Sequence, residues 1–405
     1  MKTKYAITLL TLAILGLTAC EKDLYDPNQS KETTVTDLTI PADFDWKLLK
    51  AGSCNITAAQ SVNAEIYSDD SYSKESLLAI VPVKAGSNLT LPLSLAKSTE
   101  TVYIQYKNAA NVQDRLTAPV STDGKINITI PGTTTRASSD DDFIAGQKIQ
   151  LYYPNGDFGT LLFEDNYPQL GDYDLNDFVM QYQFLIETSQ QTPNKIEHIT
   201  LIMEVKAIGA DKNIQYYIPH LRLPISPATV ADITTTERGA SANTPIQVAD
   251  VTNQTFKKNY LTLKFDGAER NTSKNPESIY LNTEFGIVSP VRTFIIDITF
   301  KETANGEYAD LNYIDADGFD FFLASADGTK EIHLSEFGSA FSDKVNQYKD
   351  ENNFVWGLNV PAPISHAIEK ANFLNAYPKF ADWVTEKTSP DPWYKNGISK
   401  YLFNY

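Results

Sequence analysis

The sequence predicts a mainly β protein, made of antiparallel β-sandwich domains with a few short helices near the C-terminus. Short runs of alternating apolar residues recur along the chain, separated by Ser, Asn, Gly and Asp, which is the spacing typical of sandwich strands. Helical spacing of apolar residues appears only late, from Ile364 onward. A hydrophobic content of 42% and an aromatic content of 11% are sufficient for packed cores.

Residues 1–19 have the pattern of a signal peptide. Lys2 and Lys4 give a positive start, and the run YAITLLTLAILGL that follows is apolar. The run is shorter than the roughly 20 apolar residues that span a bilayer. It ends in LTAC, which resembles a bacterial lipobox, and this resemblance implies cleavage before Cys20 and acylation of Cys20. The alternative is an ordinary secretory signal with an incidental cysteine.

Residues 20–36 are polar and predict a tether that links the lipid on Cys20 to the folded body. The membrane is therefore the expected partner of Cys20, and we expect an outer membrane lipoprotein on the cell surface or the periplasmic face. The net charge of −17 argues against nucleic acid as a partner. Once Cys20 is acylated, Cys54 has no partner for a disulfide, and we expect it to be a small packed residue.

The body is predicted to contain two domains. Residues 37–110 hold strand-like runs such as SLLAIVPVKAG and ETVYIQYKN and predict a small N-terminal β-sandwich. Residues 111–142 predict one more strand followed by a polar linker, because PGTTTRASSDDD has no apolar periodicity. Residues 143–405 predict a larger β-rich domain.

The larger domain has its clearest strand signal in FVMQYQF. Period-two alternation places Phe178, Met180, Tyr182 and Phe184 on one face of the strand. Near the C-terminus, ISHAIEKANFLNAYPKFADWVTEK predicts two short helices, with the second starting at Pro378.

An acidic loop precedes this strand and is the strongest candidate for a functional site. Carboxylate and amide side chains at alternate positions of a curved loop can turn toward one point, and calcium prefers six to eight such oxygen ligands. An EF-hand loop needs Gly at its sixth position and Glu at its twelfth. Counted from Asp172, these positions hold Asp177 and Gln183, so an EF-hand is excluded. The predicted cofactor is calcium, and the candidate ligands are Glu164, Asp165, Asp172, Asp174, Asn176 and Asp177.

Charge repulsion is the main argument for a cation in this loop. Two carboxylates about 4 Å apart repel by roughly 1 kcal/mol in water and by more when partly buried, and a divalent cation reverses the sign. The alternative is a solvated turn in which Asp172, Asn176 and Asp177 accept hydrogen bonds from their own backbone.

The segment FGTLLFEDNYPQLGDYDLNDFVMQYQF resembles the hallmark of the LruC-domain family, which is found in exported bacterial proteins. The C-terminal segments FDFFLASADGTKEIHL and FVWGLNVPAPISHAIEKANFLNAYPKFADWV resemble the same family, so that the similarity spans 143–405. IPADFDWKLLK resembles the start of the small β domain that precedes it in lipoproteins of Bacteroidetes-type bacteria. The resemblance implies a class and a location rather than a chemistry, and by analogy it supports calcium in the acidic loop.

Other candidate sites are weaker. Asp315, Asp317 and Asp320 surround Gly318 and could form a second cation site, although a turn between strands is favoured. The four histidines are scattered, which argues against zinc. No motif identifies catalytic residues.

The function that we expect is therefore non-catalytic. It is a lipid-anchored binding, adhesion or assembly module of the cell envelope, with a glycan or an envelope protein as its partner. The alternatives are a hydrolase that acts on polysaccharide or peptide, and a pilus-like structural subunit.

Overall fold

The structure is a computed structural model. The chain divides into two units, Met1–Thr34 and Val35–Tyr405, and the second unit is described below. The predicted signal peptide, Cys20, and the predicted linker after Gly132 lie outside the described residues. The described ranges are 33–108, 111–132, 146–189, 191–209, 217–239, 245–254, 259–269, 280–284, 286, 288–314, 318–326, 329–337, 348–386 and 392–405.

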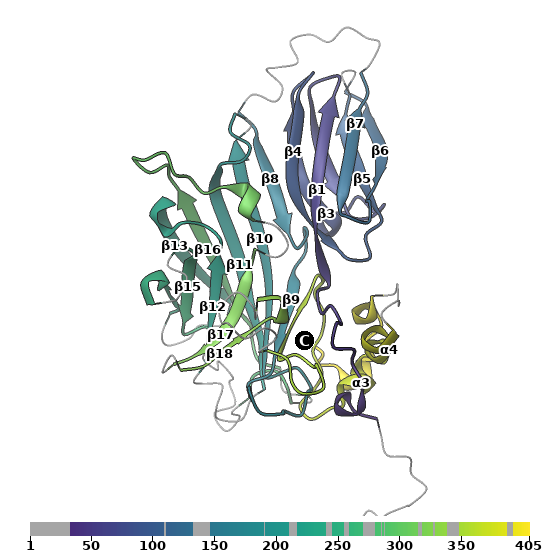
Figure 1. Ribbon diagram of the computed structural model, residues 1–405, viewed down its shortest axis with the longest axis vertical. Helices are drawn as coiled ribbons and strands as arrows, with labels where there is room; N and C mark the ends of the chain where they lie inside the picture. The colour runs from purple at the N-terminus through teal and green to yellow at the C-terminus, as the bar shows by residue number, and fades with distance from the viewer. Residues whose placement is uncertain are drawn as a thin grey trace, which may run out of the picture. The chain divides into compact units, whose positions relative to one another are not determined.

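Strands dominate these residues and confirm the predicted fold class (Figure 1). The strands are β1 Leu49–Ala58, β2 Val62–Tyr67, β3 Leu77–Val83, β4 Asn88–Ala96, β5 Thr101–Lys107, β6 Gln113–Pro119, β7 Lys125–Ile130, β8 Lys148–Tyr153, β9 Gly159–Phe163, β10 Phe178–Ser189, β11 Ile196–Ile208, β12 Tyr217–Leu223, β13 Val230–Gly239, β14 Gln247–Asp250, β15 Leu261–Asp266, β16 Arg292–Phe300, β17 Asp320–Ser325, β18 Glu331–His333 and β19 Gly357–Val360. The described α-helices are α3 Phe373–Ala376 and α4 Lys379–Glu386.

The first seven strands form a sandwich. Strands β4, β1 and β7 make one sheet, while β3, β2, β5 and β6 belong to the other (Figure 1). The pair β1–β7 is parallel, unlike the antiparallel pairs around it. Strands β6 and β7 lie after residue 110, where the predicted domain ends, yet they pair with β5 and β1 of that domain.

An eleven-stranded sheet connects this sandwich to the rest of the chain. Strand β8 pairs with β3 through Ala79↔Leu151 and Ile80↔Gln150, and with β10 on its other side. Strand β10 is long enough to serve two partners on one edge: its second half pairs with β8, and its first half pairs with β9. This arrangement puts the connection between β9 and β10 at one end of the sheet.

One face of β10 packs against a five-stranded sheet, β14-β15-β12-β17-β18. The contact is aromatic: the rings of Phe184 and Phe319 are 4.3 Å apart, and those of Tyr182 and Phe321 are 4.9 Å apart. Phe178, Met180, Tyr182 and Phe184 all lie in this core, which confirms the predicted alternation.

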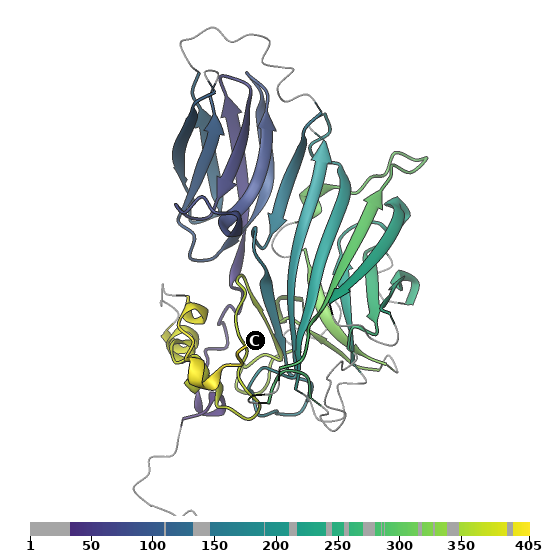
Figure 2. The same cartoon turned by 180° about the vertical axis from the view of Figure 1, so that it is seen from behind.

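The opposite face of β10 packs into a second core that joins the two ends of the described chain. Val179 of β10 lies in this core with Trp46 from the N-terminal segment and Phe380 from α4. The Trp46 ring is 5.3 Å from that of Phe354, and its Nε1 donates a hydrogen bond to the Asn353 carbonyl at 3.1 Å. Figure 2 shows the C-terminal helices beside the segment that leads into β1.

The C-terminal helices are shorter than the sequence predicts. Helix α4 starts directly after Pro378, close to the predicted start, but α3 has only four residues and 364–372 is not helical. Tertiary contacts explain the difference. The buried His366 ring bonds to the Asn282 carbonyl at 2.6 Å, and Ala367 forms a β-bridge with Leu402. These contacts hold the backbone around His366 out of a helix, and a turn follows at 369–370.

Cys54 is fully buried in the first core, which is the core that also contains Phe178 and Phe184, as predicted for a small packed residue. Burial raises the pKa of its thiol to about 12, which argues against a thiolate nucleophile. Among the residues that the structure describes, no helix has the length and apolar character needed to cross a membrane.

A buried charged cluster lies in the five-stranded sheet. The His333 ring contacts Asp320 Oδ1 through Nδ1 and Glu331 Oε2 through Nε2, each at 2.9 Å. Arg222 Nη1 lies 3.3 Å from Asp320 Oδ2. Burial favours the neutral ring, but the two carboxylates outweigh it and raise the pKa of His333 above its ordinary value. His333 therefore keeps its proton to a higher pH than a free imidazole does.

This cluster predicts a pH-dependent stability. Because the folded pKa of His333 is raised above the unfolded value of 6.5, its stabilising contribution is complete below that pH and is lost as pH rises through the folded pKa. We expect His333→Gln to lower the free energy of unfolding by more at about pH 6 than at about pH 9. Urea unfolding of both proteins across this range, in calcium, measures the difference. A constant difference would contradict the prediction.

Candidate metal centre

The acidic loop connects β9 to β10. Its two ends start from the paired residues Phe163 and Phe178, so that Glu164 and Asp177 begin and end the loop on adjacent strands. The Asp165 N–H donates to Asp177 Oδ2 at 2.8 Å, and this bond closes the base of the loop.

Three carboxylates of the loop converge. Glu164, Asp172 and Asp174 each place an oxygen within 4.8 Å of the others. Glu164 is 0% exposed and Asp174 is 1% exposed, whereas Asp172 is exposed. Two of the three negative groups are thus held away from water, and the third opens the cluster to solvent.

The backbone between these carboxylates is held in an unusual conformation. Tyr173 and Leu175 both have φ of 56°, a region that costs non-glycine residues about 1–3 kcal/mol each. Both side chains are buried in the second core, and the Tyr173 hydroxyl donates to Asp350 Oδ2 at 2.7 Å. Packing of these two apolar anchors stabilises the strained turns and fixes Asp174 between them.

Glu164 and Asp174 each accept a backbone N–H on one of their two carboxylate oxygens. Glu164 Oε1 accepts the Leu175 N–H at 2.6 Å, and Asp174 Oδ2 accepts the Lys370 N–H at 2.7 Å. Within the described part of the chain, Glu164 Oε2 and Asp174 Oδ1 are buried without a hydrogen-bond partner. A buried acceptor without a partner costs about 1–3 kcal/mol, and a charged one costs more, so this arrangement is unfavourable for the protein groups alone.

Electrostatics lead to the same conclusion. Burial raises the pKa of Glu164 well above its ordinary range, and the neighbouring Asp177, Asp174 and Asp172 raise it further. Burial and Asp172 raise the pKa of Asp174 to about 8. Burial and Asp165 raise the pKa of Asp177. Ionised carboxylates are therefore unfavourable here unless a cation compensates them.

Two glycines make room for the cluster. A Cβ atom on Gly171 would lie 2.6 Å from Glu164 Oε2, and a Cβ atom on Gly209 would lie 2.7 Å from the backbone oxygen of Asn176 and even closer to its Oδ1. Any larger residue at either position would displace an oxygen-bearing group of the loop.

The remaining predicted ligands have other contacts. Asn176 Nδ2 donates to the Ala367 carbonyl at 3.1 Å, and its buried Oδ1 has no described partner. Asp177 accepts the Asp165 N–H, as described above, and Asp165 itself lines a cleft next to the loop. The structure therefore brings together Glu164, Asp172 and Asp174 and places Asp165 and Asp177 beside them.

This donor set fits a hard divalent cation. All the converging atoms are carboxylate oxygens, which suit calcium or magnesium rather than zinc. Calcium takes six to eight oxygens, so the three carboxylates would supply only part of the shell. Water can supply the rest on the exposed Asp172 side, and such a cation would neutralise the buried charges.

Among the residues that the structure describes, the other groups singled out in the sequence do not form a comparable centre. Asp315 and Asp317 lie outside the described residues, and Asp320 is occupied by Arg222 and His333. His220 is buried, and its Nδ1 lies 2.8 Å from the Ile218 carbonyl.

The sequence contained part of the signal for the residues that support the site. Gly171 lies inside the acidic motif, and its position next to two ligands could have suggested a close approach. The Lys370 N–H and the Trp356 carbonyl, which accepts the Glu164 N–H at 2.9 Å, come from distant segments. No local pattern could have identified them.

Comparisons with known proteins identify a fold. Residues 194–394 match a family model described as a domain of unknown function, DUF4842. A solved structure from Bacteroides ovatus, described as a lipoprotein, matches with a TM-score of 0.61 at 20% identity and covers 85% of this chain and 99% of that chain. No curated protein matches the chain. At this level of identity the similarity establishes the fold alone.

The close approach at Gly209 gives a test of the site geometry. Gly209→Ala places a methyl group against the Asn176 backbone and side chain, and such overpacking destabilises by about 1–3 kcal/mol. Gly132→Ala is the matched control, because its Cβ atom would meet only Ala59, at 3.3 Å for the nearest atom. Chemical denaturation measures both variants, and equal stability would contradict the described packing.

Proposed function

We propose that the chain is an exported, lipid-anchored protein of the cell envelope, in which a calcium ion bound by Glu164, Asp172 and Asp174 stabilises the β domain. In this proposal the protein is a non-catalytic binding, adhesion or assembly module of the LruC type. The calcium ion holds the acidic loop in a defined conformation, so that the loop can present a fixed surface.

The observation that carries the proposal is the pair of buried, unpartnered carboxylate oxygens on Glu164 and Asp174. A solvated turn would expose such oxygens or bond them to its own backbone. Here they lie within 4.8 Å of an Asp172 oxygen, where mutual repulsion opposes folding. A divalent cation would contact the unpartnered oxygens and cancel the repulsion between the carboxylates. Protonation of the carboxylates would relieve the repulsion alone.

The leader supports the proposed location. LTAC ends at Cys20 and resembles a lipobox, and the Bacteroides ovatus protein that shares the fold is described as a lipoprotein. The DUF4842 match falls within 143–405, the region that resembles the LruC family.

A hydrolase is the strongest alternative, because carboxylates with raised pKa values are also a mark of active sites. Glycoside hydrolysis needs two carboxyl groups that face the substrate. Glu164 and Asp174 are buried in the loop, and Asp165 is the single carboxylate among the described residues that line the neighbouring cleft. This arrangement favours a structural role for the buried pair.

Calcium binding predicts that one double variant changes thermal stability differently in calcium and in chelator. We expect calcium to raise the melting temperature of the wild-type chain by several degrees, since a ligand that binds only the folded state stabilises it by mass action. In Asp172→Asn,Asp174→Asn this shift is lost. In chelator the same variant is at least as stable as wild type, because two repelling charges are gone. Differential scanning calorimetry measures all four conditions.

The matched control is Asp123→Asn, which removes an exposed aspartate on the turn before β7 that pairs with Lys125. It keeps the wild-type calcium shift. The proposal fails if wild type shows no calcium shift together with no bound ion in elemental analysis, or if the double variant responds to calcium as wild type does.

Acylation of Cys20 predicts incorporation of lipid in the native host. Cells fed a radiolabelled fatty acid label the wild-type chain, while Cys20→Ser abolishes the label because the thiol is the acceptor. Cys54→Ser serves as the control, since Cys54 is buried in the first core, and it retains the label. Equal labelling of wild type and Cys20→Ser would contradict the anchor.

A further inference from the structure

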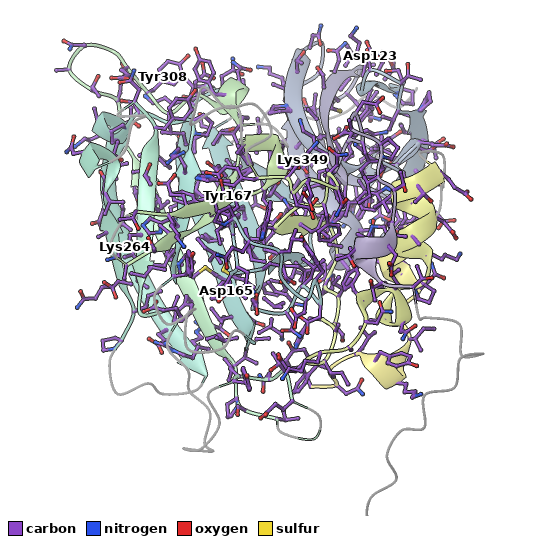
Figure 3. The ribbon with its side chains drawn as sticks, turned by 60° about the horizontal axis from the view of Figure 1, so that its bottom comes forward. Asp123, Asp165, Tyr167, Lys264, Tyr308 and Lys349 are labelled. Atoms are coloured by element: carbon purple, nitrogen blue, oxygen red, sulfur yellow. The ribbon has the colours of Figure 1, made fainter. Side chains whose placement is uncertain are left out.

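A cleft of about 570 Å³ lies against the acidic loop. This volume falls within the range of about 300–1,000 Å³ that is typical of small-molecule sites. The segment 165–169 of the loop forms one wall, and residues next to the ends of β12, β17 and β18 form the other. Figure 3 labels Asp165 and Tyr167 of the first wall.

The loop wall combines amides with an aromatic ring. Asn166 and Gln169 are exposed, and Tyr167 is half-buried. The Tyr167 ring is held in place, because it lies 5.1 Å from the Trp356 ring and 5.3 Å from the Tyr348 ring. The wall thus offers amide donors and acceptors around a ring whose position is fixed.

The opposite wall adds hydroxyls and one cation. Tyr217 is buried at the start of β12, whereas Thr329 and Lys330 are exposed just before β18. The Lys330 backbone is held against Ser325, because its N–H donates to Ser325 Oγ at 2.9 Å and its carbonyl accepts the Ser325 N–H at 2.9 Å. Both walls are therefore preorganised.

The charge of the described lining is balanced, and polar and apolar groups both contribute to it. Asp165 and Lys330 supply one charge of each sign, which gives no preference for a phosphate or a polyanion. The net charge of −17 for the whole chain opposes polyanions further. The apolar part of the lining comes from Pro168, Ala326 and the rings of Tyr167 and Tyr217. Because polar groups share the lining, it offers no wholly apolar surface for a lipid chain or an apolar helix. Hydroxyl, amide and carboxylate groups around a tyrosine ring match a ligand with many hydroxyls and one apolar C–H face.

A saccharide ring has that chemistry. We propose that this cleft binds a neutral saccharide, and that the cation site governs the binding because it closes the loop that forms one wall; the inference rests on the proposed function. A peptide fits less well. One common mode of peptide binding adds a strand to a sheet edge, and the edge strand beside the cleft, β18, has only three residues.

The link between cation and cleft is one of chain connectivity. Segment 165–169 lies between Glu164 and Asp172, two of the three converging carboxylates. A cation that joins these two residues closes the intervening chain into a short loop. The Trp356 side chain secures the middle of that loop, because its Nε1 donates to the Gln169 carbonyl at 3.3 Å. Loss of the cation frees one end of the wall.

The test uses the full chain with Cys20→Ser, purified in a detergent without a sugar headgroup. The protein is applied to a printed array of neutral oligosaccharides and to a printed array of peptides, in calcium and in chelator. We expect binding to one class of neutral oligosaccharide in calcium and a loss of about tenfold or more in affinity in chelator. Asn166→Ala,Gln169→Ala and Tyr167→Ala lose affinity to a similar extent, because they remove hydrogen bonds and the stacking surface.

Two controls separate binding from folding. Tyr313→Ala removes a tyrosine that is 66% exposed and is not among the cleft-lining residues, and it leaves affinity unchanged. Asn166→Ala,Gln169→Ala alters exposed side chains only, so its melting temperature and calcium shift match those of wild type.

The outcomes distinguish this inference from the proposed function. If calcium raises the melting temperature but no oligosaccharide binds, or if peptides bind in place of oligosaccharides, the inference is overturned while the calcium proposal stands. Binding of equal strength in calcium and in chelator, or binding unaffected by Asn166→Ala,Gln169→Ala, also overturns it. The absence of a calcium shift in melting overturns the proposed function itself.

Discussion

The structure depends on how the buried carboxylates of the β9–β10 loop are compensated. Glu164 and Asp174 are removed from water, each with one oxygen bonded to a backbone N–H and one oxygen left over. Hydrogen bonds inside a protein can offset burial of a polar group, but they leave net negative charge in place. The strained Tyr173 and Leu175 add to the cost. Apolar packing below the loop supports this conformation, and the calcium ion that we propose would offset the remaining negative charge.

Strand β10 explains why the loop occupies its position. Its alternate side chains enter two different cores, so both faces of the strand are fixed, and the paired Phe163 and Phe178 hold the loop ends together. The same strand therefore determines both the fold and the place of the carboxylates. A slip of one residue in its register would exchange the two faces, and the loop would lose its anchor along with the cores.

The sequence allowed the fold class, the alternation of Phe178 to Phe184 and the acidic character of the loop to be predicted, because all three are local patterns. It could not show that Asp172 and Asp174 converge with Glu164 while Asp165 lines the cleft. That difference depends on the left-handed backbone conformation of Tyr173 and Leu175. It also predicted too much helix near His366. Helical spacing is a local signal, and the buried bond from His366 to Asn282 overrides it.

Trp46 and Phe354 share one core although 307 residues separate Trp46 from its hydrogen-bond partner Asn353. A polypeptide is synthesised from its N-terminus, so the Trp46 indole, which also contacts Phe44, lacks Asn353 and Phe354 until nearly the whole sequence has emerged. Until then the face of β10 that carries Val179 remains exposed to solvent. The second core is therefore complete only when the C-terminal segment is present, and a truncated chain would leave Trp46 and Val179 without most of their packing partners.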